Sequence, residues 1–179
     1  MVGKKVSIAT DKPQTTRNRI TGISNLAGRG QIIFVDTPGI HDAVTPLNKR
    51  MVGAAYDAAQ ASDVVVLVVE ASSLLRTNAP ALWGADKLIL DHLKQTAPDA
   101  KRVVVVNKID LLRSREDVMV ALARLGEEER FDAYVPVRAD KGHNVRQVIE
   151  AILPLLPESP AVFPTDVVTD RGDRFLVSE

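Results

Sequence analysis

The chain has 179 residues, of which 45% are hydrophobic, and this is enough for one sizeable core. Its 23 basic and 23 acidic residues cancel, so no global charge attracts nucleic acid or an anionic membrane. The absence of cysteine excludes disulfides, thiolate metal sites and thiol nucleophiles, and any metal chemistry would use oxygen ligands. Because the longest apolar run is far too short to span a bilayer, we expect a cytoplasmic protein.

Apolar runs rich in β-branched residues predict the strands of a sheet. Two of them, residues 63–70 and 101–107, have the continuous apolar character of parallel strands that are buried on both faces. Pro136 indicates that the last strand lies at an edge, because proline cannot donate to a strand ladder. The expected strands are residues 19–26, 31–36, 63–70, 101–107 and 132–138. The strand at 19–26 is the most polar of the five.

Amphipathic patterns between these runs predict helices. Apolar residues recur there at three- and four-residue spacing, and Ser, Asp, Asn, Gly or Pro bound the segments. The alternation of strands with helices predicts an α/β fold with a doubly wound, mostly parallel sheet. The expected helices are residues 47–61, 81–96, 114–125 and 144–156.

The first candidate site follows the strand at 31–36. Asp36 stands at the carboxyl end of that strand, where open α/β sheets bind ligands, and it can hold metal-bound water. The backbone N–H of Gly39 can approach a terminal phosphate closely because no side chain intervenes. The same sequence, Asp-Thr-Pro-Gly with Thr37 second, is also ordinary turn chemistry.

The second candidate site follows the strand at 101–107. The Asp110 carboxylate can accept from both the N1–H and the 2-amino group of guanine, a donor pair that adenine lacks. Asn107 can donate to N7 or brace the loop, and the stem of Lys108 can cover the base. The competing interpretation of this motif is a strand followed by a simple Asn/Asp loop.

With both motifs present, residues 12–20 and 36–41 give the chain a resemblance to the Era family of translation-factor-like GTPases, over nearly its whole length. The resemblance implies a Ras-like P-loop NTPase fold, GTP and GDP as ligands with Mg²⁺, and GTP hydrolysis. It also implies 16S rRNA and the small ribosomal subunit as partners during assembly. By the same resemblance, Thr15 or Thr16 completes the Mg²⁺ shell, and Asp36, Thr37 and Gly39 line the nucleotide.

The family's Ser-Ala motif corresponds here to Arg138 and Ala139. The resemblance implies that the Ala139 backbone N–H donates to guanine O6. The serine hydroxyl that would brace the Asp110 loop is replaced by Arg138, and we therefore expect a reduced affinity for guanine.

Family members begin with a strand, a Gly-x-x-x-x-Gly-Lys-Ser/Thr loop and a helix, and the 179 residues contain no such loop. We therefore expect the central first strand to be missing, so that the sheet opens between the strands at 31–36 and 63–70. Residues 169–179 resemble the entry to the family's RNA-binding KH domain, whose Gly-x-x-Gly loop does not follow. The expected organisation is an incomplete G domain at 1–157, then a linker and the start of an absent KH domain at 158–179.

These expectations lead to one main hypothesis and two alternatives. The main hypothesis is an Era-like GTP-binding protein that, as this chain, is weak or inactive in hydrolysis because phosphate binding normally needs that loop. The alternatives are a non-catalytic interaction module and a truncated gene product with a misplaced start.

Overall fold

The computed structural model describes residues 20–37, 53, 55–76 and 79–169. The chain divides into two compact units, one formed by residues 1–61 with 158–179 and the other by residues 62–157. Each unit is described by itself. The predicted helix at 47–61 falls partly outside the described residues, and residues 53 and 55–60 of it are helical.

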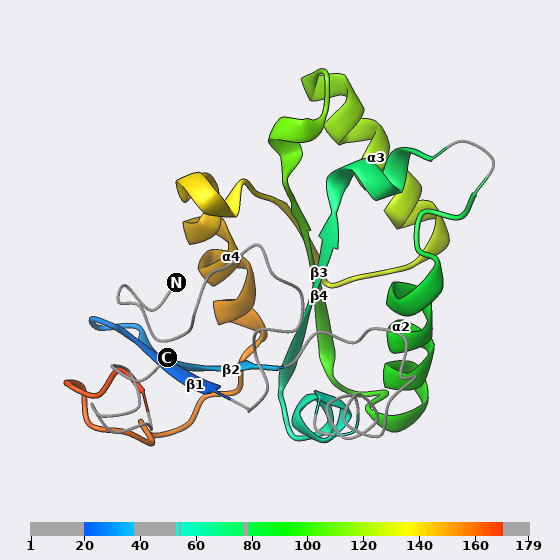
Figure 1. Ribbon diagram of the computed structural model, residues 1–179. Helices are drawn as coiled ribbons and strands as arrows, with labels where there is room; N and C mark the ends of the chain where they lie inside the picture. Colours follow the sequence, from blue (N-terminus) through cyan, green and yellow to red (C-terminus); the bar gives the residue numbers. More distant parts are fainter. Residues whose placement is uncertain (1–19, 38–52, 54, 77–78, 170–179) are drawn as a thin grey trace, which may run out of the picture. The chain divides into compact units, whose positions relative to one another are not determined.

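The first unit contains an antiparallel hairpin (Figure 1). Its strands, β1 (Ile20–Leu26) and β2 (Gly30–Asp36), pair along their whole length. The turn between them needs glycine, because Gly28 and Gly30 have φ angles of 69° and 118°, which residues with a Cβ rarely adopt. Both strands confirm the sequence-based predictions to within one residue at each end.

The segment after Pro157 returns to this hairpin. The backbone N–H of Ile23 donates to the carbonyl of Val168 at 2.8 Å, and Gly22 forms an antiparallel bridge with Thr169. The part of the predicted linker that the structure describes therefore lies alongside β1.

Two amide side chains hold the same segment. Asn25 Nδ2 donates to the carbonyls of Thr165 at 2.9 Å and Val167 at 3.2 Å. Gln31 Oε1 accepts from the N–H of Phe163 at 3.0 Å, while its Nε2 donates to the Phe163 carbonyl at 3.0 Å. The Gln31 amide thus binds the backbone N–H and C=O of a single residue, as the opposite residue of an antiparallel strand would.

The second unit is built on a parallel sheet of three strands in the order β3-β4-β5 (Figure 1). This arrangement confirms the predicted α/β fold. The strands are β3 (Val64–Glu70), β4 (Lys101–Asn107) and β5 (Ala133–Pro136). The helices are α2 (Gly84–Thr96), α3 (Arg115–Glu128) and α4 (Val145–Ile152), with short 3₁₀ turns η1 (Ala71–Leu75), η2 (Ile109–Leu111), η3 (Ala139–Lys141) and η4 (Leu153–Leu155).

β4 is the central strand, and helices cover both of its faces. Figure 1 shows α4 on one side of this sheet and α2 with α3 on the other. Side chains alternate between the faces of a strand, so Val103 and Val105 point one way and Val104 and Val106 the other. All four are buried, which explains why the β4 sequence is continuously apolar.

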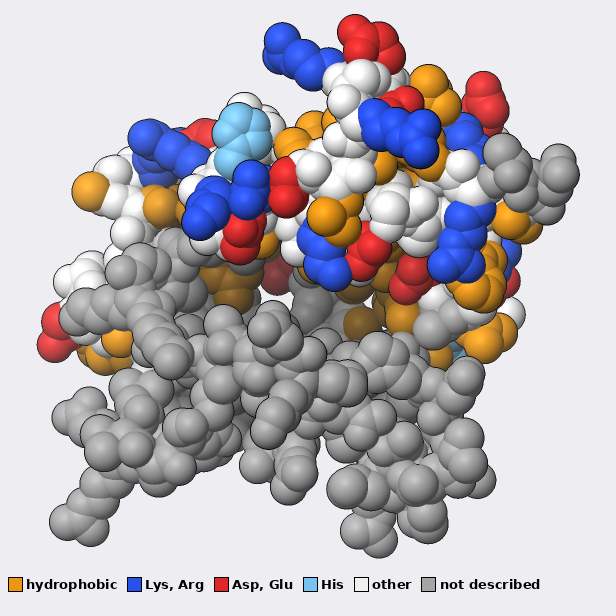
Figure 2. Space-filling model, turned by 45° about the horizontal axis from the view of Figure 1, so that its top comes forward, with side chains coloured by type: hydrophobic (Ala, Val, Ile, Leu, Met, Phe, Trp, Pro, Cys, Tyr) orange, Lys and Arg blue, Asp and Glu red, His pale blue; other side chains and the backbone are white. Residues whose placement is uncertain are grey.

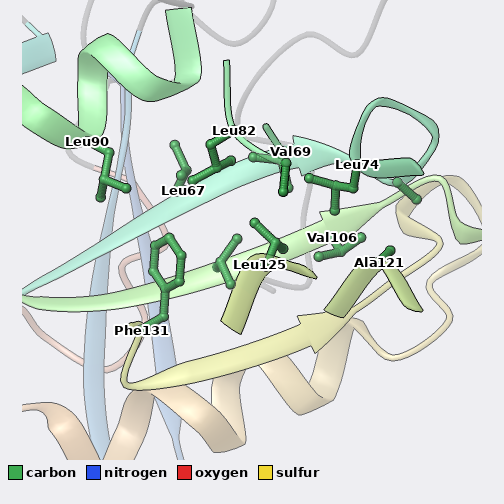
Figure 3. Close-up of a cluster of buried hydrophobic side chains, with 12 residues drawn as sticks. Leu67, Val69, Leu74, Leu82, Leu90, Val106, Ala121, Leu125 and Phe131 are labelled. Atoms are coloured by element: carbon green, nitrogen blue, oxygen red, sulfur yellow. The ribbon is translucent and has the colours of Figure 1, made fainter. Parts of the chain in front are cut away.

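The main core lies on the face of the sheet that carries α2 and α3 (Figure 3). Leu90 of α2 and Leu125 of α3 are almost completely buried there against Val104 and Val106. Burial of an aliphatic side chain of this size contributes about 1.5–3 kcal/mol. The strand ends that carry polar residues are therefore held by a closely packed core.

β3 differs from the prediction on one face. Val68 is 58% exposed, whereas the sequence predicted burial on both faces. The physical reason is that β3 is an edge strand, and α4 packs on β4 and β5 instead. Among the described residues, β3 pairs only with β4. The expected absence of a first strand beside residues 63–70 stays a prediction.

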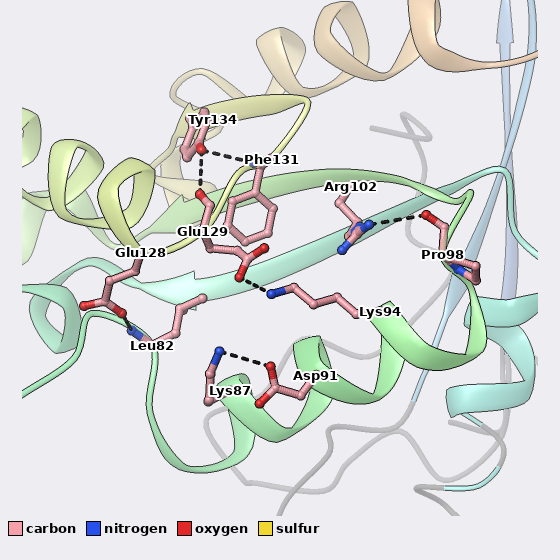
Figure 4. A network of polar contacts seen from close by, with 10 residues as sticks. All are labelled: Leu82, Lys87, Asp91, Lys94, Pro98, Arg102, Glu128, Glu129, Phe131 and Tyr134. Atoms are coloured by element: carbon pink, nitrogen blue, oxygen red, sulfur yellow. Dashed lines mark hydrogen bonds and ion pairs between the residues drawn. The ribbon is translucent and has the colours of Figure 1, made fainter.

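α2 begins three residues later than predicted. The Glu128 side chain on α3 accepts hydrogen bonds from the backbone N–H groups of Ala81 and Leu82, and both residues are buried (Figure 4). Trp83 precedes the helix with an extended backbone (φ −147°, ψ 168°), so the helical conformation begins only at Gly84. α3 in turn extends beyond the predicted end at Leu125 to Glu128, through Gly126.

Arg124, one turn before Glu128 on α3, holds the preceding loop. Its guanidinium donates to the carbonyls of Leu74 at 2.6 Å, Arg76 at 2.9 Å and Ala79 at 2.6 Å. These carbonyls lie between β3 and α2, so one side chain of α3 contacts several described residues of that connection.

Candidate nucleotide-binding site

Asn107 joins the two turns at the carboxyl ends of β4 and β5. Its Oδ1 accepts from the backbone N–H of Lys108 at 2.8 Å and from that of Ala139 at 3.1 Å. Asn107 and Ala139, which the sequence assigned to the base, are therefore adjacent, and the Ala139 N–H that was expected to donate to guanine O6 is bound to Asn107 in this structure. In this structure Asn107 braces the loop, which is one of the two roles that the sequence predicted for it.

The turn after β4 places Asp110 at the rim of the sheet. Lys108 adopts the left-handed conformation with φ 60° and ψ 40°, which is uncommon for a residue with a side chain. Asp110 follows in η2 and its side chain is 33% exposed. The carboxylate is thus partly accessible to a ligand.

Lys108 forms an ion pair with Glu70. Its Nζ lies 2.7 Å from Glu70 Oε2, and Glu70 ends β3 directly opposite Asn107. The hydrogen bond from Lys108, with a second from Ser72, holds the pKa of Glu70 below its usual range. The turn after β4 is therefore attached to the neighbouring strand β3. The sequence analysis missed Glu70, although an acidic residue at the end of a buried strand was a usable signal.

Arg138 stands where the family resemblance predicted a serine, and it contacts Asp110 in the turn after β4. Its Nε lies 3.6 Å from Asp110 Oδ2, and its Nε and Nη2 bind the Asp140 carboxylate at 3.0 and 3.2 Å. The guanidinium holds the pKa of Asp140 below its usual range. The sequence predicted that the Asp110 loop loses the brace of a serine hydroxyl at this position. In the structure, Arg138 forms an ion pair with Asp110 instead.

The turn after β5 is fixed by its backbone. Arg138 and His143 exchange two backbone hydrogen bonds, of 3.1 and 3.0 Å, and Gly142 between them has a φ of 68°. Asn144 Nδ2 donates to the Pro136 carbonyl at 2.9 Å. These contacts hold the Arg138 backbone in place.

The other predicted site residues belong to the first unit or lie outside the described residues. Asp36 ends β2 and is exposed, and Thr37 follows it. Thr15, Thr16 and Gly39 lie outside the described residues. Within the part of the chain that the structure describes, no cluster of three or more His, Cys, Asp or Glu residues could hold a metal ion.

The described surface on the strand-end side carries charges of both signs. Figure 2 turns the top of Figure 1 toward the reader, and Lys and Arg side chains there alternate with Asp and Glu. This distribution agrees with the ion pairs Glu70–Lys108 and Arg138–Asp140. The local charges are therefore largely compensated by neighbours.

A family model described as "50S ribosome-binding GTPase" matches residues 1–108. The match covers more than half of the chain and includes the strand that ends at Asn107. The chain belongs to this family of GTPases.

Among individual relatives, the chain is similar to GTPase Era. It is 40% identical to that of Geobacter sp. (strain M21) and 40% identical to that of Syntrophus aciditrophicus (strain SB), over 179 residues in each case. Each alignment covers 100% of this chain but only 57% and 55% of the respective relative. The chain thus spans little more than half the length of these proteins.

Two solved structures have the same fold. One is Era in complex with MgGDPNP and nucleotides 1506–1542 of 16S ribosomal RNA, with a TM-score of 0.82 and 31% identity. The other is a variant of Aquifex aeolicus Era bound to GDP·AlF4⁻, with a TM-score of 0.84 and 31% identity. Each alignment covers 97% of this chain and 56% of the solved chain.

The described helices include none with both the length and the apolar character needed to cross a membrane.

Proposed function

We propose that the chain is the switch and guanine-reading part of an Era-like GTPase and that it binds GDP and GTP through the turns after β4 and β5. The observation that carries the proposal is the hydrogen bond from Ala139 N–H to Asn107 Oδ1, which brings the two base-contacting turns together. Asp110, partly exposed beside them, is the group that would select guanine.

The proposed roles extend to the phosphates and the metal. Asp36 would hold a water of a bound Mg²⁺, Thr15 or Thr16 would complete its shell, and Thr37 and Gly39 would lie at the phosphates. An exposed carboxylate at the end of β2 is a suitable oxygen donor for this ion. When bound, Mg²⁺ neutralises developing charge on the phosphates.

We propose that hydrolysis by these 179 residues alone is weak or absent, because they contain no Gly-x-x-x-x-Gly-Lys-Ser/Thr sequence. Such a loop supplies the backbone N–H groups and the lysine that hold the phosphates. By likeness to the Era complex, we further propose that the protein acts on 16S rRNA. The resemblance of the sequence to this family adds the small ribosomal subunit as partner and the cytoplasm as location.

Titration calorimetry with GDP and with ADP, in the presence of Mg²⁺, tests the proposal. We expect weak binding of GDP, no binding of ADP, and loss of GDP binding in Asp110→Ala. Asp99→Ala, in the exposed turn before β4, is the matched control and should bind GDP like the parent chain. A folded chain that does not bind GDP would contradict the proposal and would favour the alternative of a non-catalytic interaction module.

Phosphate release from GTP is the second measurement. We expect a rate close to that of the buffer control, with or without Mg²⁺. Magnesium-dependent turnover that Asp36→Ala abolishes would show that the proposal of weak hydrolysis is wrong.

A further inference from the structure

Arg138 stands where it can act on the carboxylate that reads the base. Its Nε is 3.6 Å from Asp110 Oδ2, and the guanidinium side chain is only 36% exposed. Asp140 binds the same guanidinium through two hydrogen bonds, so the side chain is oriented from one side while it faces Asp110 on the other. The resulting geometry is an ion pair between Arg138 and Asp110 before any base is bound.

Guanine and hypoxanthine differ only in the 2-amino group at carbon 2 of the purine. Discrimination between them depends on the free-energy cost of leaving the Asp110 carboxylate without a hydrogen-bond donor at that position. Guanine offers two donors, N1–H and the 2-amino group, and hypoxanthine offers only N1–H. A carboxylate that loses one donor in a binding site is left with an unsatisfied oxygen, and that cost is the source of the discrimination. A cation next to the carboxylate reduces the cost.

A carboxylate has about four lone-pair sites on its two oxygens, so it can accept from a base and from a neighbouring guanidinium together. Arg138 therefore need not be displaced when guanine binds. With hypoxanthine bound, Arg138 would still neutralise the oxygen that the missing 2-amino group leaves without a donor.

We propose that Arg138 is a specificity-determining residue that relaxes the preference of the site for guanine over hypoxanthine. This inference rests on the proposed function, in which Asp110 reads the base. Partly exposed ion pairs change an equilibrium constant by about two- to fivefold, and this sets the size of the effect.

The test compares the dissociation constants of GDP and inosine diphosphate for the full 179-residue chain and its variants, with Mg²⁺ present. We expect the ratio of the two constants, inosine diphosphate over GDP, to rise about two- to fivefold in Arg138→Ala. Arg138→Lys keeps the positive charge and should restore a ratio near that of the parent chain. Arg146→Ala is the matched control, because Arg146 lies on α4 with an 88% exposed side chain and pairs with Glu150.

Three outcomes separate this inference from the proposed function. An increased ratio in Arg138→Ala, unchanged in Arg146→Ala, supports it. An unchanged or smaller ratio, with GDP still bound, overturns the role of Arg138 and leaves the proposed function intact. Failure of every folded variant and of the parent chain to bind GDP overturns both. If Arg138→Ala does not fold, Arg138→Gln makes the same comparison without the charge.

Discussion

The side-chain oxygen of Asn107 and the backbone N–H of Ala139 lie 3.1 Å apart and join turns that are 32 residues apart in the chain. We expect Asn107→Ala to lose this brace, at a cost of about 1 kcal/mol, because a backbone donor loses its partner. Amide hydrogen exchange at Ala139 should become faster. Asn107→Asp keeps the acceptor and is the control. Equal exchange at Ala139 in Asn107→Ala and the parent chain would contradict the assigned contact.

The ion pair between Glu70 and Lys108 makes a pH-dependent contribution. Because the folded-state pKa of Glu70 is lowered, its stabilisation is complete above the ordinary glutamate pKa of about 4.3 and is lost as the pH falls through the lower folded-state pKa. With both side chains more than one-third exposed, we expect the effect to be small.

An NMR titration of the Glu70 carboxyl group measures this directly. Lys108→Met should raise the pKa of Glu70 toward its ordinary value, and Ser72→Ala should raise it by less. Lys87→Met is the matched control, because the Lys87 ammonium pairs with Asp91 on α2 (Figure 4). A Glu70 pKa that is the same in Lys108→Met and in the control would show that the pair does not form in solution.

Substitution of Arg124 should destabilise the second unit more than substitution of most of its other charged residues. Removing the three hydrogen bonds of Arg124 leaves the carbonyls of Leu74, Arg76 and Ala79 without this donor, and we expect Arg124→Ala to lower the free energy of unfolding by about 2–3 kcal/mol. Urea unfolding can be followed by the single tryptophan, Trp83, whose ring contacts Arg76 of the same loop.

The matched control for Arg124 is Arg115→Ala at the exposed start of α3, with an expected change within about 0.5 kcal/mol. If the free energy of unfolding falls by similar amounts in Arg124→Ala and Arg115→Ala, the Arg124 contacts have no specific role. A large loss confined to Arg124→Ala would support a specific role.

Gln31 binds the backbone N–H and C=O of Phe163 through both ends of its amide, and its Oε1 also accepts from Val162 N–H at 3.2 Å. We expect Gln31→Ala to increase hydrogen exchange at the amides of Val162 and Phe163 severalfold, because a hydrogen bond of this kind contributes about 1 kcal/mol. Gln95→Ala, on the exposed side of α2, should leave that exchange unchanged. Fast hydrogen exchange at the Val162 and Phe163 amides of the parent chain would mean that Gln31 does not form these hydrogen bonds in solution.

The strands and the turn after β4 could be predicted because their signals are local. A continuous run of valines such as 103–106 predicts a central strand, and Asn107 to Asp110 keeps fixed spacing after it. The contact between Glu128 and the segment before α2 could not be predicted, because Glu128 lies 47 residues after Ala81 in the chain. Local patterns carry no information about such a distant partner.

The ion pair of Arg138 with Asp110 was beyond sequence reasoning for the same reason. The replacement of the family's serine was visible, but the sequence alone suggested only a lost contact. The distance of 3.6 Å depends on where Asp140 orients the guanidinium and on how the two turns meet. The exposure of Val68 likewise follows from the position of α4, which no pattern within β3 encodes.

The parallel arrangement of β3, β4 and β5 also has an evolutionary consequence. It gathers the groups proposed to contact the base in turns after the strands, while the core is formed by side chains of the strands and helices themselves. Residues 108, 110, 138 and 139 belong to those turns and are not members of the core. Ligand preference can therefore diversify by substitution at the rim while selection for folding acts on a separate set of positions.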